Sequence, residues 1–165
     1  MKNIKKYSPI EADHSLDTKE RTRLITEWYK KSFDLFIKYG FREETFYDSS
    51  INLDMMKLRP GTKELFKFLD NNSIPIIIKS AGVANTIEHF LKANNWFYKN
   101  IYLCSNKILF KDGIASRIEN EIITSLNKDK IYVPEEIKDK VSKCDTIFLL
   151  ANQINDLNKE IIILI

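Results

Sequence analysis

The sequence predicts an α/β fold, in which a helical segment precedes a parallel sheet with helices. Before residue 58, apolar residues recur at helical spacing and no β-branched run occurs. After residue 58, short apolar runs alternate with helical patterns, as in parallel strands joined by right-handed crossovers. The predicted organisation is therefore a helical cap over residues 1–57 and an α/β core over residues 58–165.

Two helices are predicted in the first segment. The longer helix covers residues 16–39, and Gly40 is a natural stop for it because glycine readily ends a helix. Its apolar positions have mainly helical spacing: Leu24, Ile25, Trp28, Phe33, Leu35 and Phe36. A shorter helix is predicted over residues 43–50. The lysines near the start of the chain are interpreted as a solvated end.

The second segment contains the predicted strands. Four short apolar runs predict strands at 74–78, 100–105, 146–150 and 161–165. Helices are predicted at 60–69, 85–94 and 134–141, the first of them started by a proline. Lys111-Asp112-Gly113, between two short apolar stretches, predicts the turn of a β-hairpin within residues 108–118.

Composition excludes several classes of protein. Hydrophobic residues make up 44% and charged residues 30% of 165 residues, which is typical of a globular domain. The net charge of +3 is mixed along the chain, so a nucleic-acid partner is not expected. No apolar run is long enough to cross a bilayer, and Cys104 and Cys144 lack metal-ligand spacing. A cytoplasmic protein with two buried thiols and no membrane partner is predicted, while its oligomeric state stays open.

Three polar clusters follow predicted strands or lie in nearby loops. Ligands of open α/β sheets bind beyond the carboxyl ends of the strands. Lys79-Ser80-Ala81-Gly82 follows the first strand, where a hydroxyl and backbone N–H groups could hold a phosphate. Lys128 lies in a polar loop, and Asn152 and Asp156 follow the strand at 146–150. Taken separately, each has a plain alternative: a turn, a solvated lysine, or a helix cap at Asp156.

Together, the order of these clusters resembles the haloacid-dehalogenase (HAD) superfamily. Within it, the chain resembles the pyrimidine 5′-nucleotidases (cytosolic 5′-nucleotidase III) over nearly its whole length. The matching motifs are Glu27-Trp28-Tyr29-Lys30-Lys31-Ser32, Ser73-Ile74-Pro75, Ser80-Ala81-Gly82, Ser105-Asn106 and Asn127-Lys128. The resemblance implies a HAD-like (Rossmannoid) parallel sheet with a helical cap. It also implies hydrolysis of nucleoside monophosphates, pyrimidine ones or 7-methyl-GMP, with Mg²⁺ as cofactor.

The resemblance assigns roles to individual residues. At the cap, Glu11 would recognise the base and Ser32 would help to bind substrate. In the core, Ser80 and Ala81 would hold the phosphate through a hydroxyl and a backbone N–H. Lys128 would neutralise charge on the phosphoryl group and the nucleophile. Asp156 would be an acidic residue of the metal motif.

The chain also departs from the family pattern. The family nucleophile lies in an Asp-x-Asp motif after a first core strand, and no Asp-x-Asp occurs before residue 58. Asn152 stands where the family has a metal-binding carboxylate, so Mg²⁺ binding at Asp156 and Asn152 is expected to be weak or lost. Lys79 is unusual before the serine. It is interpreted as a lysine that reaches solvent, or as a cation that partly replaces the metal charge.

Without the first strand, the strands at 74–78 and 146–150 are expected to pair directly. The alternatives are that the segment 161–165 moves between them, or that another chain supplies the strand.

Three functional hypotheses follow from the sequence. The first is a degenerate 5′-nucleotidase with a residual nucleotide pocket, and the second is part of a working enzyme whose first motif is lost by truncation. The third is a non-catalytic interaction scaffold with an open sheet edge.

Overall fold

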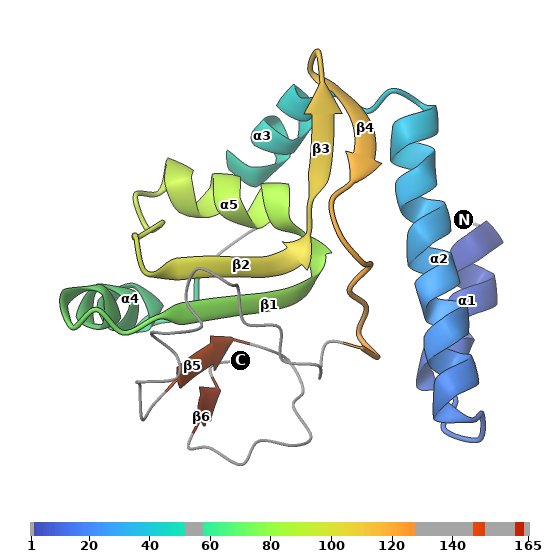
Figure 1. Cartoon of the computed structure of the whole chain (residues 1–165), viewed down its shortest axis with the longest axis horizontal. Helices are drawn as coiled ribbons and strands as arrows, with labels where there is room; N and C mark the ends of the chain where they lie inside the picture. Colours follow the sequence, from blue (N-terminus) through green and yellow to red (C-terminus); the bar gives the residue numbers. More distant parts are fainter. Residues whose placement is uncertain (1, 52–57, 128–146, 151–160, 164–165) are drawn as a thin grey trace.

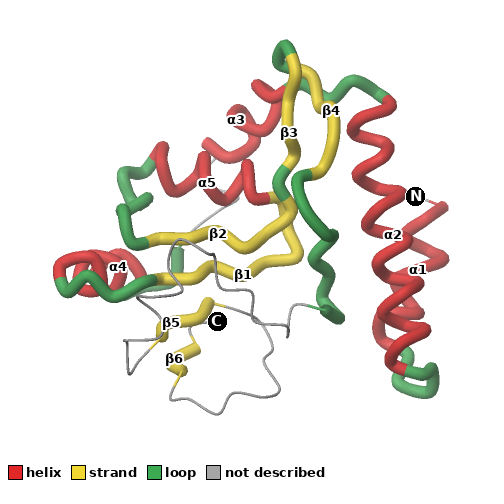
Figure 2. The backbone as a smooth tube through the Cα atoms, viewed as in Figure 1, coloured by secondary structure: helices red, strands yellow, loops and turns green. Residues whose placement is uncertain are grey.

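The chain folds as an α/β protein in a computed structural model that describes residues 2–51, 58–127, 147–150 and 161–163 (Figures 1 and 2). The helices are α1 (Lys2–Ala12), α2 (Thr18–Lys38), α3 (Glu43–Ile51), α4 (Thr62–Asn71) and α5 (Ala84–Ala93). The strands are β1 (Ile76–Val83), β2 (Ile101–Asn106), β3 (Ile108–Lys111), β4 (Ile114–Ile118), β5 (Ile147–Leu150) and β6 (Ile161–Ile163). The predicted α/β fold is therefore confirmed, while the helix predicted at 134–141 lies outside the described residues.

Helices α1 and α2 lie side by side, as Figure 1 shows. Helix α2 begins after Asp17, whose carboxylate accepts hydrogen bonds from the N–H groups of Lys19 (2.9 Å) and Glu20 (3.2 Å). Helix α1 was not predicted, because its lysines suggested a solvated end. Tyr7 shows why it forms: the ring is fully buried and stacks on Trp28 of α2, with ring centroids 5.9 Å apart.

The main sheet has the strand order β2-β1-β5-β6, and its strands are parallel. Strands β1 and β5 are direct neighbours, with Ile76 opposite Phe148 and Ile78 opposite Leu150. The predicted direct pairing is thus confirmed. Strand β6 lies on the far side of β5 and does not insert beside β1.

Helices α4 and α5 cover one face of β1 and β2. The buried side chains between them form a core cluster of Phe66, Leu69, Ile76, Phe90, Leu91 and Ile101. Because side chains alternate along a strand, Ile77 and Lys79 of β1 lie on the opposite face. The amphipathic patterns of the two helices therefore build a core against the amino-terminal ends of β1 and β2, which begin at Ile76 and Ile101.

The hairpin β3–β4 connects the first helices to the sheet. Its turn has positive φ angles at Asp112 (53°) and Gly113 (75°), the backbone conformation that tight hairpins favour. The hairpin stands between α2 and α3 in Figure 1. A second cluster of buried residues joins these elements: Phe33, Phe46, Ile108 and Ala115. Helix α3 also packs on α5, where Tyr47 stacks on His89.

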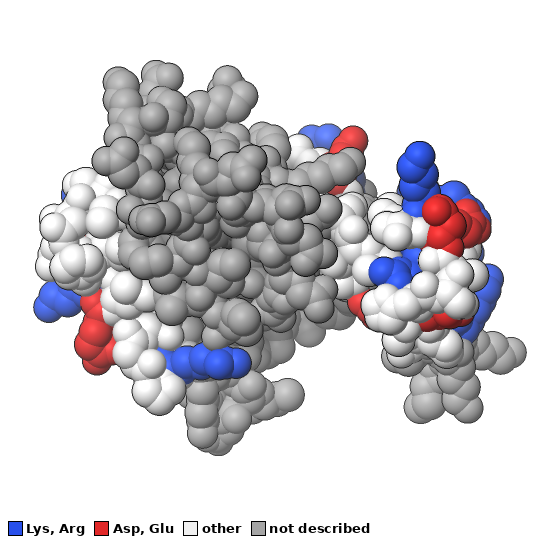
Figure 3. Space-filling model, turned by 90° about the horizontal axis from the view of Figure 1, so that it is seen from below, with Lys and Arg blue, Asp and Glu red and all other residues white. Residues whose placement is uncertain are grey.

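Charged side chains of both signs lie on the described parts of the surface in Figure 3, at its left and right margins. On α2, Arg23 pairs with Glu20 at 2.7 Å and Lys31 pairs with Glu27. Such exposed pairs contribute little to stability. Among the described helices, none has the length and apolar character that a membrane span requires.

Candidate functional site

The carboxyl end of β1 carries the predicted phosphate-binding residues. A turn was predicted from Lys79 onward, but β1 continues to Val83, and this boundary is corrected. Ser80 still pairs with Ser105 of β2; then the register shifts, so that Val83 pairs with Asn106. The shift makes Ala81 and Gly82 a bulge, because two residues of β1 have no direct opposite on β2. Sequence periodicity could not reveal this bulge, since it depends on the register between β1 and β2.

Ser80 also stabilises the bulge locally. The N–H of Gly82 donates a hydrogen bond to Ser80 Oγ at 3.0 Å. A Cβ at position 82 would lie 3.2 Å from the same oxygen, a tight contact that glycine avoids. The motif Ser80-Ala81-Gly82 is therefore a compact backbone loop at the strand end, the kind of structure that can present N–H groups to an anion.

Asn106 holds this loop in place. Its side chain is 2% exposed and donates hydrogen bonds to the carbonyls of Ala81 (2.8 Å) and Gly82 (3.2 Å). The same amide donates to the carbonyl of Ile123 and accepts from the Ile123 N–H, both at 2.8 Å. Ser105 Oγ adds a bond to the Gly82 carbonyl at 2.8 Å. One buried asparagine therefore connects the loop of residues 80–82 to the segment around residue 123.

That segment ends in a turn, residues 122–127, which is closed by its own side chains. Asn127 accepts a hydrogen bond from the N–H of Thr124 at 2.6 Å and donates to the carbonyl of Ile122 at 2.9 Å. Thr124 is fully buried, and its hydroxyl accepts from the N–H of Leu126. The predicted Lys128 follows this turn directly but lies outside the described residues. So do Asn152, Asp156 and Cys144.

The predicted cap residue Glu11 reaches the same turn. It lies in the last turn of α1, and its carboxylate accepts a hydrogen bond from the hydroxyl of Ser125. Tyr29 of α2 is close enough to interact electrostatically with the Glu11 carboxylate. Burial, and to a lesser degree the charge of Glu11, raise the pKa of the Tyr29 phenol. The turn 122–127 thus contacts both the loop of residues 80–82, through Asn106, and the cap glutamate.

Ser32, the other predicted cap residue, lies on α2 and is half-buried. Its hydroxyl donates to the Trp28 carbonyl one turn earlier in the same helix, at 2.9 Å. This bond is local to the helix, as is common for serine in helices. The structure therefore brings Glu11 and the loop of residues 80–82 into one hydrogen-bonded network, and the bond that Ser32 makes stays within α2.

Lys79 does not reach solvent, so that interpretation was wrong. Its side chain is 5% exposed, because residue 79 lies in the middle of the sheet rather than at a strand end. It sits opposite Cys104 of β2. Cys104 is a buried free thiol, as predicted; burial raises its pKa, and the charge of Lys79 opposes that effect.

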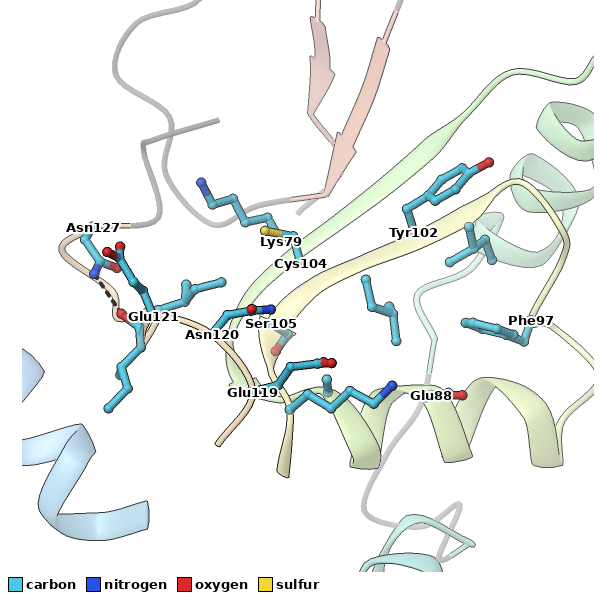
Figure 4. A pocket seen from close by; sticks show the side chains of 16 residues that line it. Lys79, Glu88, Phe97, Tyr102, Cys104, Ser105, Glu119, Asn120, Glu121 and Asn127 are labelled. Atoms are coloured by element: carbon cyan, nitrogen blue, oxygen red, sulfur yellow. Dashed lines mark hydrogen bonds between the residues drawn. The ribbon is translucent and has the colours of Figure 1, made fainter. Parts of the chain in front are cut away.

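A groove of about 850 Å³ runs along β2, next to the network (Figure 4). Lys79 and Cys104 lie on one side of the β1–β2 pair, and Glu88 and Phe97 lie on the other, beside α5. Asn127 lines the groove where it approaches the turn 122–127. Neither Glu11 nor Ser80 is among the lining residues, so the groove adjoins the predicted site without containing it.

Metal binding has no donor set in the described part of the chain. Within those residues, no group of three His, Cys, Asp or Glu side chains could hold an ion. The predicted ligands Asp156 and Asn152 are not described, so weak Mg²⁺ binding stays a prediction.

The parallel sheet with helices on one face and a helical segment before it is the architecture of a HAD-like α/β protein. A family model described as Pyrimidine 5′-nucleotidase (UMPH-1) matches residues 1–161. The chain belongs to this pyrimidine 5′-nucleotidase family, as the motifs predicted.

Relatives and solved structures agree with this assignment. The 7-methylguanosine phosphate-specific 5′-nucleotidase of Drosophila melanogaster is 29% identical over 153 residues, which are 92% of this chain and 48% of the relative. The protein of the same name from Gallus gallus is also 29% identical, over 92% of this chain and 53% of its own. The crystal structure of cytosolic 5′-nucleotidase IIIB bound to cytidine is similar with a TM-score of 0.77 and 29% identity, covering 89% of this chain and 50% of that one. The chain therefore spans about half the length of the relatives it matches.

Sequence reasoning missed three members of the network. Asn106 and Asn127 were noticed only as parts of matching motifs, and no role was assigned to them. Ser125 gave no signal, because a serine in a polar loop is ordinary and its partner Glu11 is 114 residues away in the sequence.

Proposed function

We propose that this chain binds nucleoside 5′-monophosphates, with the base at Glu11 and the phosphate at Ser80 and Ala81. The observation that carries the proposal is the shared framework of these two ends: Ser125 contacts Glu11, and Asn106 connects the same turn to the loop of residues 80–82. The helical cap of residues 1–57 and the core of residues 58–165 would each contribute one end of the site.

The phosphate end suits an anion for a physical reason. Asn106 and Ser105 donate hydrogen bonds to the Ala81 and Gly82 carbonyls, which keeps these oxygens directed toward the donors. A dianion is repelled by exposed carbonyl oxygens and attracted by N–H groups. Helix α5 begins at Ala84, after its N-cap residue Val83 and close to the loop, so its N-terminal dipole adds to the attraction.

The base end suits a ring that carries N–H donors. An ionised carboxylate has about four lone-pair sites and donates nothing, so Glu11 would favour an exocyclic amino group, such as that of cytosine. Cytidine is bound by the similar solved structure, and 7-methylguanosine phosphate appears in the names of the relatives. CMP and 7-methyl-GMP are therefore the proposed ligands, with UMP as a weaker one.

Hydrolysis by this polypeptide alone is not expected. Its sequence contains no Asp-x-Asp, whereas the family reaction uses an aspartate nucleophile. Lys128 would neutralise charge on a bound phosphate, and Mg²⁺ would supply further charge neutralisation where it binds. A cytoplasmic location is part of the proposal.

Calorimetric titration with CMP, UMP and 7-methyl-GMP tests the proposal. Saturable 1:1 binding of CMP is expected, and Glu11→Gln should weaken it about tenfold because an amide replaces the charged acceptor. Glu20→Gln, on the exposed surface of α2, is the matched control and should leave the affinity for CMP unchanged. Wild-type protein that gives no heat with any of the three nucleotides would refute the proposal. A phosphate-release assay with CMP and Mg²⁺ should show no turnover.

An interaction scaffold is the second candidate, and one observation favours it. Within the described chain, β2 has a neighbour, β1, on only one side, and the groove of about 850 Å³ follows its other side. Such an edge can accept a strand from a partner. Size-exclusion chromatography with light scattering distinguishes the candidates, since a monomer with no co-purifying protein counts against a scaffold.

A further inference from the structure

We propose that Ser125 is a positioning residue for base recognition: its hydroxyl orients the carboxylate of Glu11 toward the bound base. The inference rests on the proposed nucleotide site and adds a residue to it. Ser125 donates to Glu11 Oε1 across the junction between α1 and the turn 122–127, and both side chains are half-buried.

Ser125 can act this way because its backbone is held rigidly. Side-chain hydrogen bonds hold the turn that carries it. The Asn127 side chain bonds the Thr124 N–H and the Ile122 carbonyl, and the Thr124 hydroxyl accepts from the Leu126 N–H. Thr124, directly before Ser125, is fully buried. A hydroxyl on such a turn loses little freedom when it forms a hydrogen bond, so it can fix the orientation of its partner.

Glu11 needs such a partner because of its own position. It lies in the last turn of α1, where the partial negative charge of the helix C-terminus disfavours a carboxylate. A hydrogen bond from Ser125 to one oxygen offsets this effect and stops the side chain from rotating. The other lone pairs of the carboxylate remain able to accept N–H groups of a base.

The same contact relates the base end to the phosphate end. Ser125 follows Ile123 by two residues, and Ile123 is bonded in both directions to Asn106. Asn106 in turn holds the carbonyls of Ala81 and Gly82. The separation between Glu11 and the loop of residues 80–82 is thus set by a short chain of hydrogen bonds.

A purely structural role for Ser125 predicts a different result. If the hydroxyl only fastened α1 to the core, its loss would lower the affinity for every ligand equally. A positioning role predicts that ligands with a base lose affinity while a ligand without one does not. Discrimination between ligands is therefore the decisive measurement.

The experiment compares Ser125→Thr with Ser125→Val, two side chains of the same shape that differ in the hydroxyl. Each is titrated calorimetrically with CMP, UMP and ribose 5-phosphate. We expect Ser125→Val to bind CMP about tenfold more weakly and to bind ribose 5-phosphate within about twofold of wild type, while Ser125→Thr keeps the wild-type profile. Ser116→Ala is the control, since the Ser116 hydroxyl bonds only the Leu109 carbonyl on the exposed hairpin. Ser125→Ala replaces the valine variant if that one does not fold.

The outcomes separate this inference from the proposed function. Wild-type protein that binds none of the ligands would overturn both. Wild-type binding together with an equal loss for all three ligands in Ser125→Val would overturn the positioning role alone. Unchanged CMP affinity in the folded valine and alanine variants would do the same.

Discussion

The two ends of the proposed nucleotide site are built in different ways. At the phosphate end, a side chain that is 2% exposed, Asn106, holds backbone carbonyls of two separate segments. At the base end, one hydrogen bond joins two half-buried side chains, Glu11 and Ser125. Backbone held by a buried amide cannot move without local unfolding, whereas a half-buried side-chain pair can be substituted with little loss of stability. Changes at the phosphate end should therefore affect stability, and changes at the base end should affect selectivity.

The largest effect is expected for Asn106→Asp. The substitution replaces the donating NH₂ by an oxygen that would face the carbonyls of Ala81, Gly82 and Ile123. Repulsion and an unpaired buried charge should lower the free energy of unfolding by about 3 kcal/mol or more, measured by urea denaturation. Asn72→Asp is the control, because the Asn72 amide also donates to a carbonyl but is exposed, and it should lose less than about 1 kcal/mol. An equal loss of unfolding free energy in both variants would contradict the conclusion that the buried Asn106 amide holds the loop of residues 80–82 in place.

A smaller loss is expected for Asn127→Ala. The variant removes two hydrogen bonds of the half-buried turn, to the Thr124 N–H and the Ile122 carbonyl. The free energy of unfolding should fall by about 1–2 kcal/mol, and hydrogen exchange at Thr124 should accelerate. Ser116→Ala should change the stability by less than about 0.5 kcal/mol. Unaltered exchange at Thr124 would show that the turn does not depend on Asn127.

The base end can be tested through the titration of Tyr29. Burial and the charge of Glu11 raise its pKa above the usual value of 10.0. The folded state thus favours the protonated phenol, so its contribution to stability is complete below pH 10 and is lost as pH rises through the folded-state pKa. In protein labelled with ¹³C-tyrosine, Glu11→Gln should lower this pKa only part of the way, because burial, the larger cause, remains. Tyr29→Phe assigns the signal, and a pKa unaffected by Glu11→Gln would place the carboxylate away from Tyr29.

The smallest effect on stability is expected for Ser32→Ala. Its hydroxyl bonds only a carbonyl of its own helix, so the free energy of unfolding should change by less than about 0.5 kcal/mol. Weaker CMP binding without loss of stability would support the substrate-binding role implied by the family resemblance. Thr26→Ala is matched to it, since Thr26 makes the same type of bond to Thr22 on the same helix. Equal weakening of CMP binding in both variants would argue against a specific role for Ser32.

Most of the fold could be predicted from patterns within the sequence. The helices at α2, α4 and α5 show apolar spacing, and the strands β1, β2 and β5 are short apolar runs. Helix α1 escaped because its stability depends on Tyr7 stacking against Trp28, a tertiary contact that lysine-rich local sequence does not reveal.

The candidate site was predicted only where a residue type suggests its chemistry. Ser80 and Glu11 could be proposed from motifs, and the structure connects them. Asn106 and Ser125 act through partners far away in the sequence, 25 and 114 residues respectively, so their roles depend on the folded backbone. The burial of Lys79 was missed for a similar reason, because it depends on how far β1 continues.

The direct pairing of β1 with β5 has a kinetic consequence. A polypeptide carrying a further central strand could enter the sheet only after this pair, joined from Ile76–Phe148 to Ile78–Leu150, had separated. At saturating concentrations of such a peptide, complementation would proceed at the rate at which the two strands part. Adding more peptide would then not increase the rate.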